Sequence, residues 1–144
     1  MAFRRIAVLA ALAWPQVAQG APAVTTDSSI YVERRDEDAG RRLEMTDSFG
    51  KGDRVVTILR WQRPRGAGGF TIVNPLPRAI SYQASSRADE AVSVDGGRTW
   101  GRLGQIRIGD RLASPEDVTH VRWRIPQGIA AHGRGQIAYS GIVR

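Results

Sequence analysis

The sequence predicts an all-β fold arranged as an antiparallel β-sandwich, and three observations support this prediction. Apolar and polar residues alternate along several short segments, which is typical of half-buried strands. Clusters of glycine and proline separate these segments, and no segment shows a helical period of useful length. The chain has 144 residues, which is enough for one domain with a single apolar core.

The N-terminal residues predict a signal peptide, which we place at residues 1–23. The pair Arg4-Arg5 precedes the apolar run Ile6–Trp14, and small residues follow that run. The run is too short to span a bilayer, which needs about 20 residues. Cleavage after Gly20 and cleavage after Ala23 both fit the pattern, so we expect export to the periplasm or the cell surface. No second apolar segment follows that would cross a membrane after cleavage.

Composition argues against several classes of function. The net charge is +7, but the basic residues are scattered and many stand beside acids, whereas a nucleic-acid binder clusters them on one face. The chain has no cysteine, so it offers no disulfide, thiol chemistry or cysteine zinc site. Its two histidines, His120 and His132, stand in no metal-binding pattern. We therefore expect no cofactor, no metal, no nucleic-acid partner and no catalytic residues.

Strands are first expected at Ser29–Glu33 and Leu43–Thr46, with the charged stretch Arg34–Arg42 as a loop or hairpin tip between them. The strongest strand is Val55–Trp61. It is apolar on both faces, which predicts a central position in its sheet. Phe70–Val73 follows as the next strand. We expect the chain to leave the sheet after it, because two prolines come next and a proline cannot donate to a strand ladder.

The second half of the chain continues this pattern. Ile80–Gln83 is expected as a strand and Gln105–Ile108 as a weak one. Val118–Ile125 alternates sharply, with Trp123 on the more apolar side, and therefore predicts a half-buried antiparallel strand. Gln136–Val143 is expected as the last strand.

A tight β-hairpin is predicted around the sequence Ser-Val-Asp-Gly-Gly-Arg-Thr-Trp at residues 93–100. Its strands would be Glu90–Val94 and Thr99–Leu103, because the two central glycines supply the positive φ that such a turn needs. Asp95 can accept hydrogen bonds from N–H groups just ahead of it, and the ring of Trp100 is expected to be buried. We assign a structural role to six residues of this stretch: Ser93, Asp95, Gly96, Gly97, Thr99 and Trp100.

Four motifs occur in the order Gly52–Val56, Trp61, Gly69–Pro77 and Ile80–Tyr82. Near the end of the chain, the glycine-containing segment 129–135 precedes Ile137-Ala138-Tyr139. In this order they resemble the bacterial "conserved repeat domain", an exported module of unknown function with an immunoglobulin-like sandwich. The resemblance covers roughly residues 24–144 and implies one immunoglobulin-like β-sandwich domain without catalytic residues. Members of that family are often tandem repeats, whereas this chain shows no internal repeat.

The stretch around Asp95 also resembles the Asp-box (S-x-D-x-G-x-T-W) of sialidase-like propellers, where the box is a structural hairpin. It occurs once here, and the chain is too short for a propeller of four or more blades. We interpret it as the same local sequence pattern for forming a hairpin.

These observations predict an exported, non-enzymatic β-sandwich module that acts in binding or assembly at the bacterial cell envelope. The alternative is a carbohydrate-binding module that uses surface tryptophans, for which Trp61, Trp100 and Trp123 are the candidates. Their pattern places Trp61 and Trp123 on the more apolar faces of their strands, which favours a core position. The partner is unknown, with another envelope protein and a glycan as the two open classes.

Overall fold

The structure, a computed structural model, describes residues 23–36 and 40–144. The predicted signal peptide therefore lies almost wholly outside the described residues. The strands are β1 (Thr25–Asp36), β2 (Gly40–Met45), β3 (Arg54–Gln62), β4 (Phe70–Pro75), β5 (Ile80–Ser85), β6 (Ala91–Ser93), β7 (Arg107–Ile108), β8 (Arg111–Leu112), β9 (His120–Ile125) and β10 (Arg134–Val143). A 3-10 turn, η1 (Pro115–Asp117), precedes β9, and one short helix, α1 (Gln127–Ala130), follows it.

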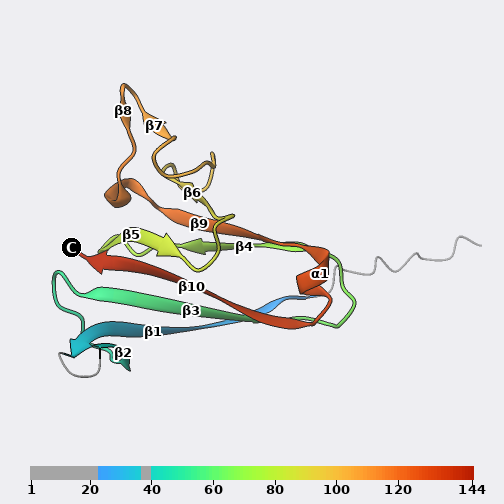
Figure 1. The fold of residues 1–144 in the computed structure, drawn as a ribbon. Helices are drawn as coiled ribbons and strands as arrows, with labels where there is room; N and C mark the ends of the chain where they lie inside the picture. Colours follow the sequence, from blue (N-terminus) through green and yellow to red (C-terminus); the bar gives the residue numbers. More distant parts are fainter. Residues whose placement is uncertain (1–22, 37–39) are drawn as a thin grey trace, which may run out of the picture.

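The strands form two main antiparallel sheets (Figure 1). The larger sheet has five strands in the order β2-β1-β3-β10-β5, and the smaller has three in the order β4-β9-β6. A separate two-stranded ribbon, β7-β8, stands away from both. The mostly β, antiparallel architecture confirms the coarse prediction from the sequence, while the immunoglobulin-like arrangement stays a prediction.

The two sheets share one apolar cluster. Trp61 of β3 meets the edge of Phe70 of β4 with ring centroids 5.0 Å apart, and Trp123 of β9 lies 5.7 Å from Tyr139 of β10. The Trp123 indole also donates a hydrogen bond of 2.9 Å to Ser85 Oγ, so its polar edge is satisfied inside the core. Trp61 and Trp123 are 1% and 0% exposed, which confirms their predicted core positions.

Strand β3 occupies the centre of the larger sheet, between β1 and β10, as its two apolar faces predict. Val55, Thr57, Leu59 and Trp61 are buried on one face, and the residues between them are half-buried or exposed. On β9, Val121, Trp123 and Ile125 are buried as the alternation predicts.

The first strand is longer than predicted. Residues Thr25–Ser28 are polar, yet they pair with β3 through contacts such as Ser28 opposite Leu59. The charged stretch Arg34–Arg42, predicted as a loop or hairpin tip, joins the paired strands β1 and β2. Its residues 34–36 and 40–42 belong to those strands, and residues 37–39 lie outside the described residues. Backbone pairing, which is indifferent to side-chain polarity, extends both strands beyond the alternating segment.

Strand β4 continues to Pro75 and does not stop at Val73. Asn74 pairs with Val121, and Pro75 stands opposite His120. This pairing is compatible with proline because β4 is the edge strand of the smaller sheet, where a missing N–H can face away from the ladder. The expectation that the prolines end the pairing after Val73 is therefore wrong. Between β7 and β9 the chain forms β8 and η1, and between β9 and β10 it forms α1.

A glycine on β10 provides the space for one of the core tryptophans. Gly135 stands opposite Trp61 in the ladder, and a Cβ added to it would lie 2.4 Å from Cζ2 of that ring. Real Cβ atoms do not approach so closely, so the ring would have to move in a closely packed core.

We expect Gly135→Ala to destabilise the protein by about 1–3 kcal/mol, the usual cost of overpacking, and to lower the melting temperature by several degrees. Thermal unfolding followed by circular dichroism measures this. The matched control is Gly128→Ala in α1, where an added Cβ meets nothing within 4 Å and alanine suits a helix better than glycine. Equal melting of both variants would contradict the packing described here.

Candidate functional site

A network of hydrogen bonds closes the loop at residues 93–100. The buried Ser93 hydroxyl donates to Asp95 Oδ1 at 2.7 Å and accepts from the Gly97 N–H at 2.8 Å. Asp95 Oδ1 also accepts from the N–H groups of Arg98 and Thr99 at 3.1 and 2.9 Å, and the Thr99 hydroxyl donates to Oδ2 at 2.7 Å. The Asp95 carboxylate is thus the centre of the loop.

The two glycines let the chain turn around this carboxylate. Gly96 and Gly97 have φ angles of +77° and +89°, in the region where other residues are strained. The Gly96 N–H donates to the Thr119 hydroxyl at 3.1 Å, and that hydroxyl donates to the Ser93 carbonyl at 3.1 Å. The loop is therefore also tied to the residue before β9.

The loop reverses the chain between Val92 and Gly101, which exchange two backbone hydrogen bonds of 2.8 and 3.0 Å, so the predicted hairpin is reduced to a single antiparallel bridge. The strand β6 covers only Ala91–Ser93, and its ladder runs along β9. The predicted partner strand, Thr99–Leu103, meets β6 through one isolated bridge between Val92 and Gly101. The reason is local: the Asp95 carboxylate accepts from the Thr99 N–H, which the next rung of a hairpin ladder would have used.

Trp100 is half-buried, which corrects the expectation of a buried ring. The Arg122 guanidinium lies over the indole, 4.4 Å from its centroid, and the His120 ring stands edge-on at 6.5 Å. Since Trp61 and Trp123 are buried, Trp100 is the one tryptophan of these three that reaches the surface, and Arg122 occupies one of its faces. The three candidates do not form a shared sugar platform.

The loop also determines the ionisation of Asp95. The hydrogen bonds from the Thr99 hydroxyl and N–H, followed by that from Ser93, hold the pKa of Asp95 well below its ordinary value of 3.8. In the same way, the Arg111 guanidinium and the Ser114 N–H lower the pKa of Asp117 in η1. Carboxylates stabilised as anions in this way do not accept a proton near neutral pH.

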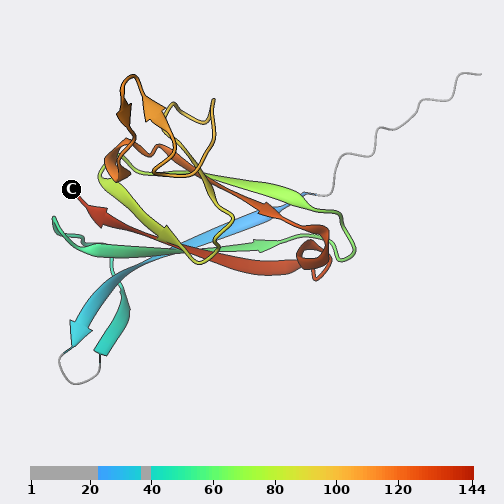
Figure 2. The same cartoon turned by 45° about the horizontal axis from the view of Figure 1, so that its top comes forward.

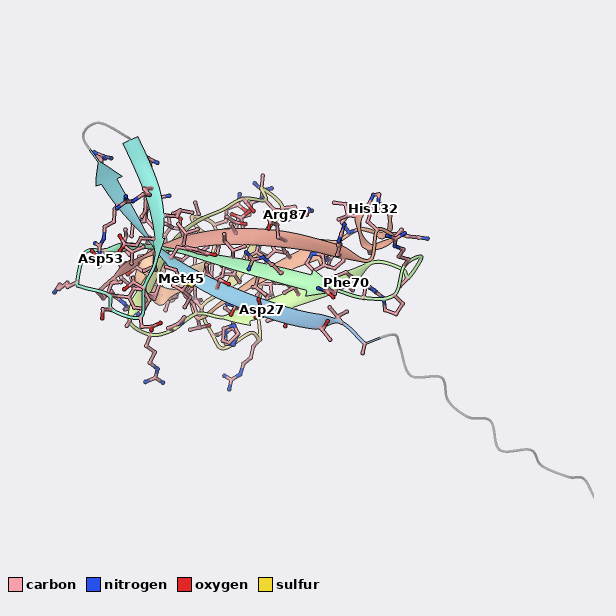
Figure 3. All side chains as sticks on the ribbon, turned by 90° about the horizontal axis from the view of Figure 1, so that it is seen from below. Asp27, Met45, Asp53, Phe70, Arg87 and His132 are labelled. Carbon is pink, nitrogen blue, oxygen red and sulfur yellow. The ribbon has the colours of Figure 1, made fainter. Side chains whose placement is uncertain are left out.

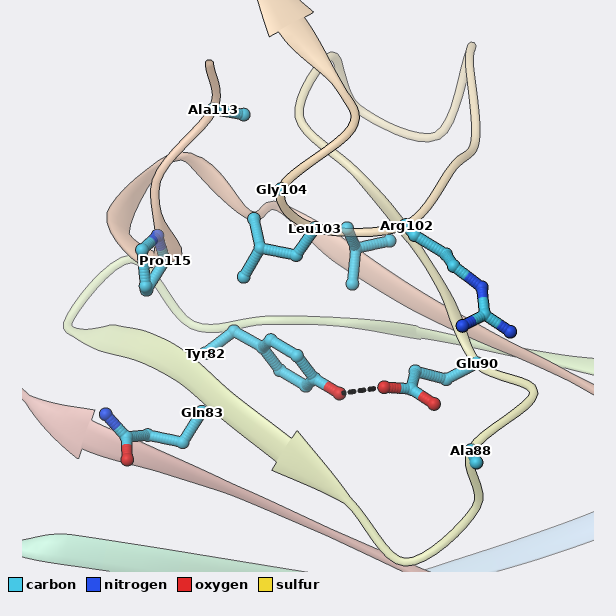
Figure 4. A pocket seen from close by; sticks show the side chains of 10 residues that line it. Tyr82, Gln83, Ala88, Glu90, Arg102, Leu103, Gly104, Ala113 and Pro115 are labelled. Atoms are coloured by element: carbon cyan, nitrogen blue, oxygen red, sulfur yellow. Dashed lines mark hydrogen bonds between the residues drawn. The ribbon is translucent and has the colours of Figure 1, made fainter.

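A cavity of about 490 Å³ lies between β5 and the segment 102–115 (Figure 4). At its floor, the Tyr82 hydroxyl donates to Glu90 Oε1 at 3.1 Å, while Leu103 and Pro115 lie on the other side of the opening. Burial, together with the negative charge of Glu90, raises the pKa of Tyr82 well above its ordinary value of 10. This phenol keeps its proton at neutral pH, so the pair is a structural hydrogen bond in the wall of the cavity.

The two histidines lie in different surroundings. His120 is half-buried on β9, where its Nδ1 lies 3.0 Å from the Thr119 hydroxyl, and His132 is exposed after α1. Within residues 23–36 and 40–144, no three histidine or acidic side chains gather where they could hold a metal ion. No helix in the described part of the chain is long and apolar enough to cross a membrane.

The β1–β2 hairpin projects away from the rest of the protein (Figure 2). Strand β2 stands at the end of the larger sheet, and all six of its residues are exposed. Leu43 and Met45 are 46% and 67% exposed, and Figure 3 shows Met45 on β2 at the near side of the molecule. The outer edge of β2 is therefore a row of backbone groups open to solvent, beside two exposed apolar side chains.

The apolar surface continues from β2 across the sheet. The ladder places Met45 opposite Tyr31, and Tyr31 opposite Val56, so these three side chains form a row on one face. On the other face of β1, Ile30 and Phe49 are each 40% exposed and line an apolar cavity of about 300 Å³. Both faces next to the free edge thus carry apolar side chains in contact with water.

Comparison with known proteins finds no family model, no curated protein and no solved structure that matches the chain. The resemblance to the conserved repeat domain and to the Asp-box therefore stays a prediction.

Sequence reasoning placed a short strand at Leu43–Thr46 but did not recognise it as a free edge. The available signal was the pair Leu43 and Met45, alternating with charged residues in a highly charged stretch. Which strand stands at the end of a sheet depends on long-range pairing, and a local pattern does not reveal it.

We expect Asp95→Asn to make the protein less stable at neutral pH and to flatten its acid sensitivity. Because the pKa of Asp95 is lowered by folding, its stabilisation is complete well above pH 3.8 and is lost as the pH falls below that value. Urea unfolding at pH 7 and at pH 3 measures both effects. The control is Asp27→Asn, whose side chain is 79% exposed. If the two variants show the same pH dependence, the loop does not stabilise the Asp95 anion.

Proposed function

We propose that the protein is an exported, non-enzymatic module that binds or assembles with another protein at the bacterial cell envelope through the free edge of β2. The supporting observation is the exposure of all six β2 residues at the end of the larger sheet. An edge strand presents unpaired N–H and C=O groups, and an extended segment of a partner can add to it as a further strand. Main-chain hydrogen bonds then supply affinity, and side chains such as Leu43 and Met45 supply specificity.

Export is part of this proposal. It is supported by the charged, apolar and small-residue segments at residues 1–23, which lie almost wholly outside the described residues. The finer fold, an immunoglobulin-like β-sandwich, is proposed as well. Two antiparallel sheets that share one apolar cluster, with Trp61 and Trp123 at its centre, support it.

The state of three titratable groups, Asp95, Asp117 and Tyr82, favours a binding module over an enzyme that uses these groups. Asp95 and Asp117 are held as anions by hydrogen bonds within their own loops, and Tyr82 is held as the neutral phenol. Each of these three groups already has an internal hydrogen-bond partner. Groups in this state act as structural links rather than as general acids or bases near neutral pH.

We expect a photo-crosslinking residue at position 45 to trap a partner in the envelope fraction of living cells. The control is the same residue at position 112, since Leu112 is 52% exposed but lies on the separate β7–β8 ribbon. Adducts are identified by mass spectrometry. A discrete adduct at position 45 that is missing at position 112 supports the proposal. No adduct at position 45, or the same adducts at both positions, would refute it.

A further inference from the structure

We propose that the partner of the β2 edge is a second copy of this chain, paired antiparallel with its own β2 about Leu43. The inference rests on the proposed function, because it uses the same free edge. It is carried by the charge pattern of the strand, Gly-Arg-Arg-Leu-Glu-Met, all six residues of which are exposed.

Symmetry restricts how two copies of one strand can pair. In a two-fold antiparallel pair, a residue a given number of places before the centre faces the residue the same number of places after it. Facing side chains must also lie on the same face of the sheet, and therefore the centre falls on a residue and not between two. Two registers pair five of the six residues, those centred on Arg42 and on Leu43, whereas centring on Arg41 or on Glu44 pairs only three.

Only the register on Leu43 matches charges. It places Arg42 opposite Glu44 of the second copy, and by symmetry this pair occurs twice. The two Leu43 side chains face each other on the opposite face of the sheet. Centring on Arg42 would set two arginines against each other, and centring on Glu44 would set two glutamates against each other. The strand is thus complementary to itself in one register.

The residues of this register are free to change partners. The Arg42 and Glu44 side chains are 66% and 53% exposed, and within the chain they approach only to 3.9 Å. Such an exposed contact contributes little, so little is lost when each meets the opposite charge on the second copy. The Leu43 side chain, 46% exposed, loses contact with water in the same step.

The resulting assembly would be a closed dimer in which the two larger sheets become continuous. Each copy uses its single β2 edge, so the two-fold contact does not propagate into a fibre. Because one six-residue strand makes the contact, the dimer is expected to depend on protein concentration.

Charge reversal tests the register directly. Arg42→Glu and Glu44→Arg should each weaken the dimer by roughly tenfold or more, because two attractive cross-strand pairs become repulsive. A mixture of the two variants should form a heterodimer, since every pair across the strands is then opposite in charge. The double variant should dimerise like the natural chain. Sedimentation velocity over a range of concentrations measures all of these, and Arg124→Glu, at an exposed site on the smaller sheet, is the control.

A cysteine at position 43 provides a second measurement that does not depend on charge. Facing Cα atoms in an antiparallel pair are about 4.5–5.5 Å apart, within the range that a disulfide spans. The natural chain has no cysteine, so Leu43→Cys should give a single disulfide-linked dimer on mild oxidation. Met45→Cys should not link to itself, since those residues would stand about 13 Å apart along the strand.

A natural chain that stays monomeric at all concentrations would overturn the inference, as would single charge variants that dimerise normally. If position 45 then still traps a different envelope protein, the homodimer alone is wrong and the proposed function stands. If position 45 traps nothing as well, both are wrong.

Discussion

The larger sheet has five strands and the smaller has three, and this difference in width determines which parts of the larger sheet are covered. The smaller sheet has three strands, and its contacts with the larger sheet run through Trp61–Phe70 and Trp123–Tyr139, on β3 and β10. Strands β1 and β2 extend the larger sheet beyond these contacts, so Ile30 remains 40% exposed although it lies on the face that carries the core residues of β3. Met45 is exposed on the opposite face of the same sheet. Apolar side chains on an unpaired edge are a liability unless a partner covers them. The smaller sheet therefore covers the core residues of the larger sheet but does not reach its β2 edge, which stays open to solvent.

The loop around Asp95 is held in place by side-chain hydrogen bonds. The chain has no cysteine to fix an irregular segment, and side-chain hydrogen bonds from Ser93 and Thr99 to one carboxylate hold it instead. The link through Thr119 joins the loop to β9 and so to the core strand that carries Trp123. The polar groups of Ser93, Asp95 and Thr99 bond to one another. We therefore assign them a structural role and place the interaction at the β2 edge of the larger sheet.

The sequence predicted those features that depend on local alternation. The burial of Trp61 and Trp123 followed from which face of a strand each occupies, and the central position of β3 followed from its two apolar faces. Features that depend on distant partners were missed. The place of Pro75 in a ladder requires an edge, the extra length of β1 requires β3 alongside it, and the tight fit of Gly135 requires the ring of Trp61 on the neighbouring strand.

The central claim is that the backbone groups on the outer edge of β2 pair with another strand. Amide hydrogen exchange of the natural protein, followed residue by residue at rising concentration, tests it most directly, because exchange reports hydrogen bonding of individual N–H groups. The account predicts that, within residues 41–45, the amides that point away from β1 gain protection as the concentration rises, whereas those of the loop at 93–100 do not change. If these β2 amides exchange fast at every concentration of the purified protein, the two copies do not pair. If they also exchange fast when the protein is in the envelope fraction, this edge is not used for binding at all.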